Sequence, residues 1–86
     1  MDENYSVTKD KLLEILYGIQ SAYTKIETKN KFRSRYYKIF FKSAEDLFRT
    51  VYILNGKKYS NLIGNIGDLR INEEKLMIYV VPFKIK

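Results

Sequence analysis

The chain of 86 residues is basic, with 16 lysines and arginines against 10 aspartates and glutamates, and it contains neither histidine nor cysteine. Its length fits one domain, residues 1–86, and its hydrophobic fraction of 45% and aromatic fraction of 15% supply a core and argue against disorder. The two missing residue types exclude imidazole-based nucleophile systems, disulfides and thiolate metal sites. We therefore expect a protein that is not an enzyme and binds no cofactor and no metal.

The composition also bears on the compartment and the source. Small secreted domains usually depend on disulfides, so a chain without cysteine is expected to be cytoplasmic. The acidic start at residues 1–3 is unlike a signal peptide, and the longest apolar run, residues 76–81, is far shorter than the ~20 residues of a membrane span. Heavy use of lysine, asparagine, isoleucine and tyrosine is typical of AT-rich genomes and points to a bacterial, viral or mobile-element gene.

An amphipathic helix is predicted over residues 8–26, after the possible N-caps Ser6 and Thr8. Its apolar positions recur at spacings of three and four, as one face of a helix requires. They are Leu12, Leu16, Ile19, Tyr23 and Ile26. Gly18 weakens this helix by about 1 kcal/mol relative to alanine.

A single strand is predicted over residues 31–42, where aromatic and branched side chains dominate. Tyr37, Ile39 and Phe41 share one face with Arg33 and Arg35, so the second half of the strand is expected to enter the core. The other face carries Phe32, Ser34, Tyr36, Lys38, Phe40 and Lys42.

A second helix is predicted over residues 43–54. Ser43 is its N-cap, Glu45 and Asp46 favour the positive end of the helix dipole, and Asn55-Gly56 stops it.

A loop over residues 57–68 and a β-hairpin complete the chain. Residues 69–71 and 76–81 are the predicted strands, and the polar residues 72–75 form the turn. The continuous apolar run indicates a central strand that is buried on both faces, and regular pairing should weaken at Pro82, which has no N–H to donate.

These elements predict an α+β domain in the order α-β-α-β-β, with two helices on a three-stranded, mostly antiparallel sheet. The alternative is a winged helix-turn-helix, which requires a recognition helix over residues 58–66 and the terminal hairpin as its wing. Gly64 disfavours that helix, and Glu73 and Glu74 would place acid on a wing that faces DNA.

The positive charge is concentrated in residues 25–42. This stretch has seven basic residues and one acidic residue, a net of +6; the remainder has nine of each and nets zero. The charged residues are Lys25, Glu27, Lys29, Lys31, Arg33, Arg35, Lys38 and Lys42.

A nucleic-acid site, for DNA or RNA, is the function that this stretch favours. Lysine and arginine neutralise phosphates, and exposed aromatic rings stack on unpaired bases. The candidate binding residues are Lys29, Lys31, Phe32, Arg33, Arg35, Tyr36, Tyr37, Lys38 and Lys42. The same lysines also suit a helix C-terminus or an edge strand that must avoid aggregation.

Two other functions remain open. The basic stretch also suits an acidic protein surface, as in a phage or viral inhibitor or adaptor that binds a host protein. A histidine-free ribonuclease toxin is the second alternative, since Lys31, Arg33, Arg35 and Tyr36 supply the side chains that it would use.

A homodimer through the first helix is also expected. A chain this short gains little from its own core, and Leu13 and Ile15 widen the apolar stripe of that helix.

Asp68 with Glu73 or Glu74 could hold magnesium, although turns are commonly acidic for solubility.

Overall fold

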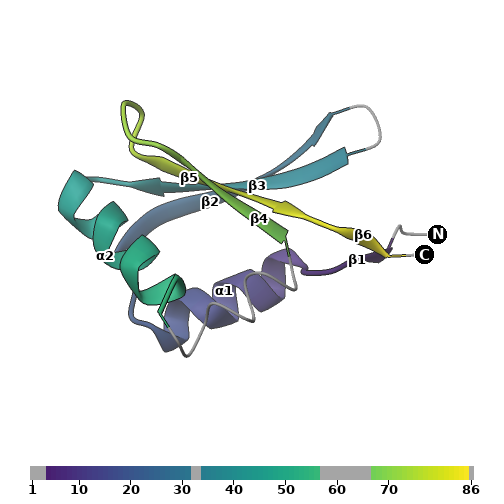
Figure 1. Cartoon of the computed structure of the whole chain (residues 1–86), viewed down its shortest axis with the longest axis horizontal. Coiled ribbons are helices and arrows are strands. Elements are labelled where there is room, and N and C mark those ends of the chain that lie inside the picture. Colours follow the sequence, from purple (N-terminus) through teal and green to yellow (C-terminus); the bar gives the residue numbers. More distant parts are fainter. Residues whose placement is uncertain (1–3, 32–33, 57–66, 86) are drawn as a thin grey trace.

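Two α-β-β units follow one another along the chain. The computed structural model describes residues 4–31, 34–56 and 67–85. Its elements are β1 (Asn4–Tyr5), α1 (Lys9–Gly18), β2 (Tyr23–Lys31), β3 (Ser34–Phe41), α2 (Ala44–Leu54), β4 (Gly67–Asn72), β5 (Met77–Pro82) and β6 (Lys84–Ile85). Figure 1 shows both helices on one side of the main sheet. The predicted α+β class is confirmed.

The main sheet has four antiparallel strands in the order β2-β3-β5-β4, rather than the three strands predicted. The additional strand is β2, so the order of the larger elements is α-β-β-α-β-β. β1 and β6 form a separate antiparallel pair that brings the two ends of the chain together (Figure 1).

The helix predicted over residues 8–26 is wrong in its second half, because α1 ends at Gly18. Gln20 adopts a positive φ of 56°, and the Ser21 N–H donates to the Leu16 carbonyl at 3.0 Å. This is the pattern of a Schellman C-cap, here with glutamine where glycine is usual. From α2, Arg49 Nη1 donates to the carbonyl oxygen of Gln20 at 3.3 Å.

Tyr23 and Ile26 therefore belong to β2, and the single strand predicted over residues 31–42 is instead two paired strands. Lys31 pairs with Ser34, so β3 begins only at Ser34. The predicted alternation in the second half of the strand is confirmed, since Tyr37, Ile39 and Phe41 are buried, whereas Tyr36, Lys38 and Phe40 are half-exposed.

α2 and the terminal hairpin agree with the prediction. The Ser43 side chain accepts a hydrogen bond from the Asp46 N–H at 3.2 Å, as an N-cap does. β4 and β5 flank the turn, and β5 lies between β3 and β4 as a central strand. The expected burial of β5 on both faces is wrong, because Tyr79 and Val81 on its other face are only half-buried. β5 ends at Pro82 opposite Gly67, which has a φ of +156° and no room for a side chain against the Val81 carbonyl.

The core lies between the helices and one face of the sheet. Its fully buried residues come from both helices and both central strands, and include Leu12, Leu16, Ile39, Leu47, Leu54, Ile78 and Val80. On α1, Ile15 is also buried in the core and Leu13 is half-buried, so packing within the chain already covers most of the wide stripe from which a dimer was expected. The homodimer stays a prediction, but the wide apolar stripe of the first helix no longer supports it.

The recognition helix of a winged helix-turn-helix, over residues 58–66, lies outside the described residues, as does most of the loop predicted over 57–68. The end of that loop is different, since Gly67 and Asp68 begin β4. No helix in the described part of the chain is long and apolar enough to cross a membrane.

Candidate nucleic-acid interface

The sheet has an inner face packed on the helices and an outer face that no described helix covers (Figure 1). Directly paired residues in antiparallel strands point to the same side. One row of such pairs crosses all four strands on the outer face, through Glu27, Lys38, Tyr79 and Arg70 in turn. On one side of it lies the row Lys25, Phe40, Met77 and Asn72, and on the other side lie the pairs Lys29–Tyr36 and Val81–Asp68.

Among the described side chains, four cations lie on this outer face, Lys25, Lys29, Lys38 and Arg70, and the carboxylate of Glu27 forms ion pairs with two of them. Glu27 forms ion pairs with Lys25 at 3.1 Å and with Lys29 at 3.4 Å. The hydrogen bond from Lys25, followed by the charges of both lysines, lowers the pKa of Glu27 below its ordinary value, although partial burial opposes this. Within the described ranges, Lys38 and Arg70 make no ion pair, so both are available to an anionic ligand.

Aromatic rings alternate with these cations. The rings of Tyr36 and Tyr79 meet edge-to-face, with centroids 6.0 Å apart and planes at 88°. Lys25 Nζ lies 4.7 Å from the Phe40 ring centroid, and Lys38 Nζ lies 6.0 Å from that of Tyr79. A shallow hollow of about 350 Å³ opens beside the tyrosine pair. Its lining is Tyr36, Arg70, Tyr79 and Val81.

The outer face contains three of the predicted site residues, Lys29, Tyr36 and Lys38. Lys42 is exposed and follows directly after β3. Phe32, Arg33 and the side chain of Lys31 lie outside the described residues.

Two predicted site residues face the other way. Tyr37 is only 1% exposed and its hydroxyl donates to the Val7 carbonyl at 3.2 Å, so this ring belongs to the core and cannot stack on a base. Arg35 lies on the inner face, where its Nε donates to Asn30 Oδ1 at 3.2 Å and its guanidinium lies 4.8 Å from the Tyr5 ring centroid. The predicted site included residues from both faces of one strand, whereas alternate residues of a strand point to opposite faces and cannot all contact one ligand.

Sequence reasoning missed four outer-face residues: Lys25, Phe40, Arg70 and Tyr79. Lys25 was counted in the basic stretch but assigned to a helix end. Arg70 and Tyr79 come from the terminal hairpin, 34 and 43 residues further along the chain than Tyr36, which lines the same hollow. The polar tip of Tyr79 within an apolar run was the available signal, because such a tip needs solvent or a partner.

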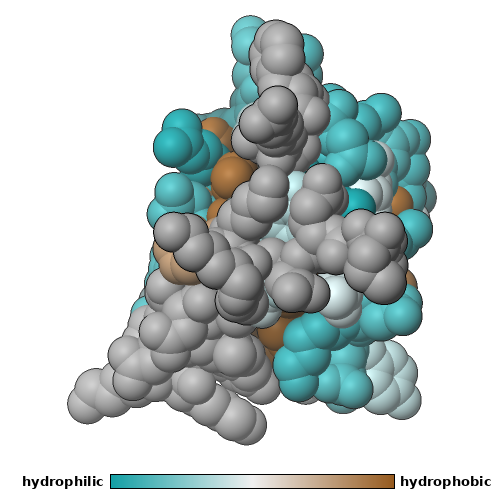
Figure 2. Space-filling view, turned by 90° about the vertical axis from the view of Figure 1, so that its right-hand side faces the viewer, coloured by the Kyte–Doolittle hydropathy of each residue, from teal (hydrophilic) through white to brown (hydrophobic). Residues whose placement is uncertain are grey.

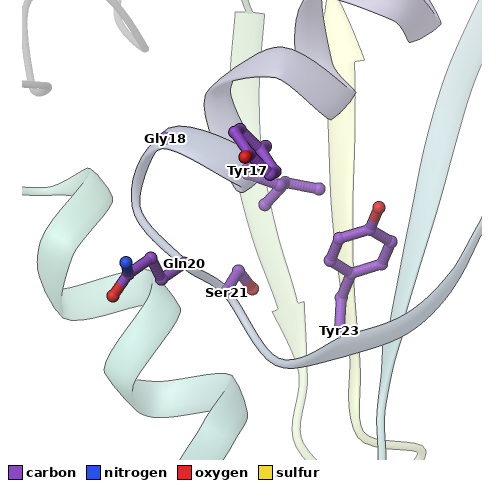
Figure 3. A pocket seen from close by; sticks show the side chains of 6 residues that line it. Tyr17, Gly18, Gln20, Ser21 and Tyr23 are labelled. Carbon is purple, nitrogen blue, oxygen red and sulfur yellow. The ribbon is translucent and has the colours of Figure 1, made fainter.

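A second hollow, of about 400 Å³, lies where α1 ends (Figure 3). Its lining is Leu16, Tyr17, Gly18, Gln20, Ser21 and Tyr23. These side chains carry no formal charge and no activated nucleophile, and Tyr17 is 85% exposed. This second hollow therefore has no cationic side chain to bind an anionic ligand, whereas the outer face of the sheet has several.

Comparison with known proteins assigns no relative: no family model, no curated protein and no solved structure matches the chain. The described residues contain no group of three or more acidic side chains placed to hold a metal ion. Seen from the end where the termini lie, the described surface is mostly hydrophilic, with hydrophobic residues in small separate patches (Figure 2). The outer face of the sheet is therefore the feature from which a function can be inferred.

Proposed function

We propose that the protein binds nucleic acid through the outer face of its sheet. The observation that carries this proposal is the row Glu27–Lys38–Tyr79–Arg70, in which four strands present charged and aromatic side chains to the same side. A helix-free face with this composition suits an extended, negatively charged and ring-bearing ligand.

Each element of the face has a counterpart in a polynucleotide. Lys38 and Arg70, which no described carboxylate neutralises, supply charge for phosphates and release counterions on binding. Tyr36, Phe40 and Tyr79 supply rings for bases or sugars. The lysines of β2 extend the positive surface to the sheet edge, where they also discourage edge-to-edge pairing.

The test is fluorescence anisotropy with labelled DNA and RNA, single-stranded and duplex, at 50 and 150 mM salt. We expect a Lys29→Ala/Lys38→Ala double variant to bind more weakly and to reduce the salt slope by about 0.7–0.9 for each phosphate that the variant no longer neutralises. The matched control is Lys9→Ala/Lys11→Ala, which removes the same charge from α1 on the opposite side of the sheet. Lys11 also forms an ion pair, with Glu14 at 3.0 Å, as Lys29 does with Glu27.

Absence of wild-type binding to every probe at 50 mM salt would overturn the proposal. Equal weakening in the two double variants would also contradict it, because it would show a response to net charge rather than to one face. A nuclease-resistant, stoichiometric protein partner in a pull-down, combined with absent nucleic-acid binding, would instead support the acidic-protein alternative.

A further inference from the structure

We infer that the hollow lined by Tyr36, Arg70, Tyr79 and Val81 takes one unpaired nucleobase, so that the ligand is single-stranded nucleic acid. This inference rests on the proposed function and specifies its substrate class. It is carried by the geometry of the hollow and by the charges around it.

The tyrosine pair forms a corner. Because the planes of Tyr36 and Tyr79 meet at 88°, the rings do not stack on each other, and ring surface is left for a third flat group. Val81 adds an apolar wall. The volume of about 350 Å³ is near the lower end of the 300–1,000 Å³ typical of small-molecule sites, which suits one base better than a larger ligand.

Arg70 supplies directed hydrogen bonds at the rim. It is exposed, it lies opposite Tyr79 in the β4–β5 pairing, and it has no hydrogen-bond or ion-pair partner among the described residues. Its planar, forked donors match either a phosphate or the O6 and N7 acceptors of guanine. Lys38, next to Tyr79 on the β3 side, places a second cation where the adjoining phosphate would lie.

A duplex cannot use this arrangement. Its bases are stacked on one another and paired, so their flat faces are hidden, whereas in a single strand each base has a free π-face. We therefore expect the tyrosine rings to favour single strands over duplexes by stacking on a base, while the lysines attract both kinds of nucleic acid.

The experiment compares single-stranded 12-mers of DNA and of RNA with duplexes of the same sequence by anisotropy. We expect wild-type protein to prefer the single strands, and Tyr79→Leu to weaken single-strand binding about 5- to 150-fold, as the removal of one stacking interaction implies. Tyr79→Phe, which keeps the ring, should retain binding. Tyr17→Leu removes an exposed tyrosine from α1 and should change nothing.

Photo-crosslinking keeps the test independent of variant stability. Wild-type protein irradiated with bromouracil-substituted single strands should crosslink at Tyr36 or Tyr79, as mapped by mass spectrometry. Equal affinity for duplex and single strand, or crosslinks confined to other elements, would overturn the inference and leave the proposed function standing. Failure of all nucleic acids to bind would remove the proposed function itself.

Discussion

Replacing Glu27 with glutamine should tighten nucleic-acid binding. Glu27 lies in the central row of the outer face and holds Lys25 and Lys29 in ion pairs. Since its pKa is lowered from an ordinary 4.5, chiefly by the hydrogen bond from Lys25, the carboxylate is fully ionised at pH 7. It then repels phosphates and occupies two lysines that would otherwise bind them.

The size of the effect follows from the charges on the face. Among the side chains that the structure describes, four cations (Lys25, Lys29, Lys38 and Arg70) and two carboxylates (Glu27 and Asp68) give 4 − 2 = +2, and Glu27→Gln raises this to +3. Neutralising one additional phosphate steepens the single-strand salt slope by about 0.7. Over the one decade of salt concentration between 1 M and 0.1 M, a slope that is steeper by about 0.7 raises the affinity about fivefold.

The assay is anisotropy with a single-stranded oligonucleotide across 25–500 mM salt. Glu14→Gln is the matched control, because Glu14 is also ion-paired to a lysine but lies on α1. Weaker or unchanged binding by Glu27→Gln would refute the reasoning. An equal gain in Glu14→Gln would show that total charge, rather than the outer face, determines affinity.

Three further predictions concern pH and stability. Because the pKa of Glu27 is lower in the folded state than in the unfolded state, ionised Glu27 stabilises the fold above pH 4.5. This stabilisation is lost as the pH falls through the pKa of Glu27 in the folded state. The melting temperature of the wild type should therefore drop more steeply than that of Glu27→Gln between about pH 5 and 3. Gly18→Ala should raise the free energy of unfolding by about 0.5–1 kcal/mol in urea titrations, since a Cβ there meets no atom within 4 Å. Tyr37→Phe should lower the free energy of unfolding by about 1 kcal/mol through loss of its buried hydrogen bond, while nucleic-acid affinity stays unchanged; weaker binding with an intact melting temperature would contradict the inward placement of this ring.

Local signals in the sequence were sufficient for α2 and the terminal hairpin. Ser43 at the N-cap, the apolar stripe that follows, and Asn55-Gly56 each act within one or two turns of the helix, and the structure confirms the helix that they predict. The hairpin was equally local, since the polar turn separates two short strands that pair with each other.

The end of α1 depended on tertiary contacts that the periodicity conceals. Tyr23 and Ile26 continue the helical spacing by coincidence, because a β-bulge between Tyr23 and Lys25 brings both residues to the core side of β2 although they are three positions apart. The chain leaves the helix through Gln20 at positive φ, where Arg49 of α2 holds the terminal carbonyls. Neither feature has a sequence signature as clear as a C-terminal glycine.

The candidate site was predicted only in part for the same reason. The excess charge of residues 25–42 was evident from the sequence, and Lys29, Tyr36 and Lys38 do share the outer face. The tyrosine pair and Arg70 required knowledge that β5 lies beside β3, which is a long-range pairing.

Amide chemical-shift mapping with a single-stranded oligonucleotide tests the central claim most directly. In ¹⁵N-labelled protein, we expect the largest changes in the central strands and β4, at Tyr36, Lys38, Arg70 and Tyr79, with side-chain shifts of the two tyrosine rings. Changes confined to the exposed surfaces of α1 and α2, with these four residues unmoved at saturation, would contradict the proposed binding face.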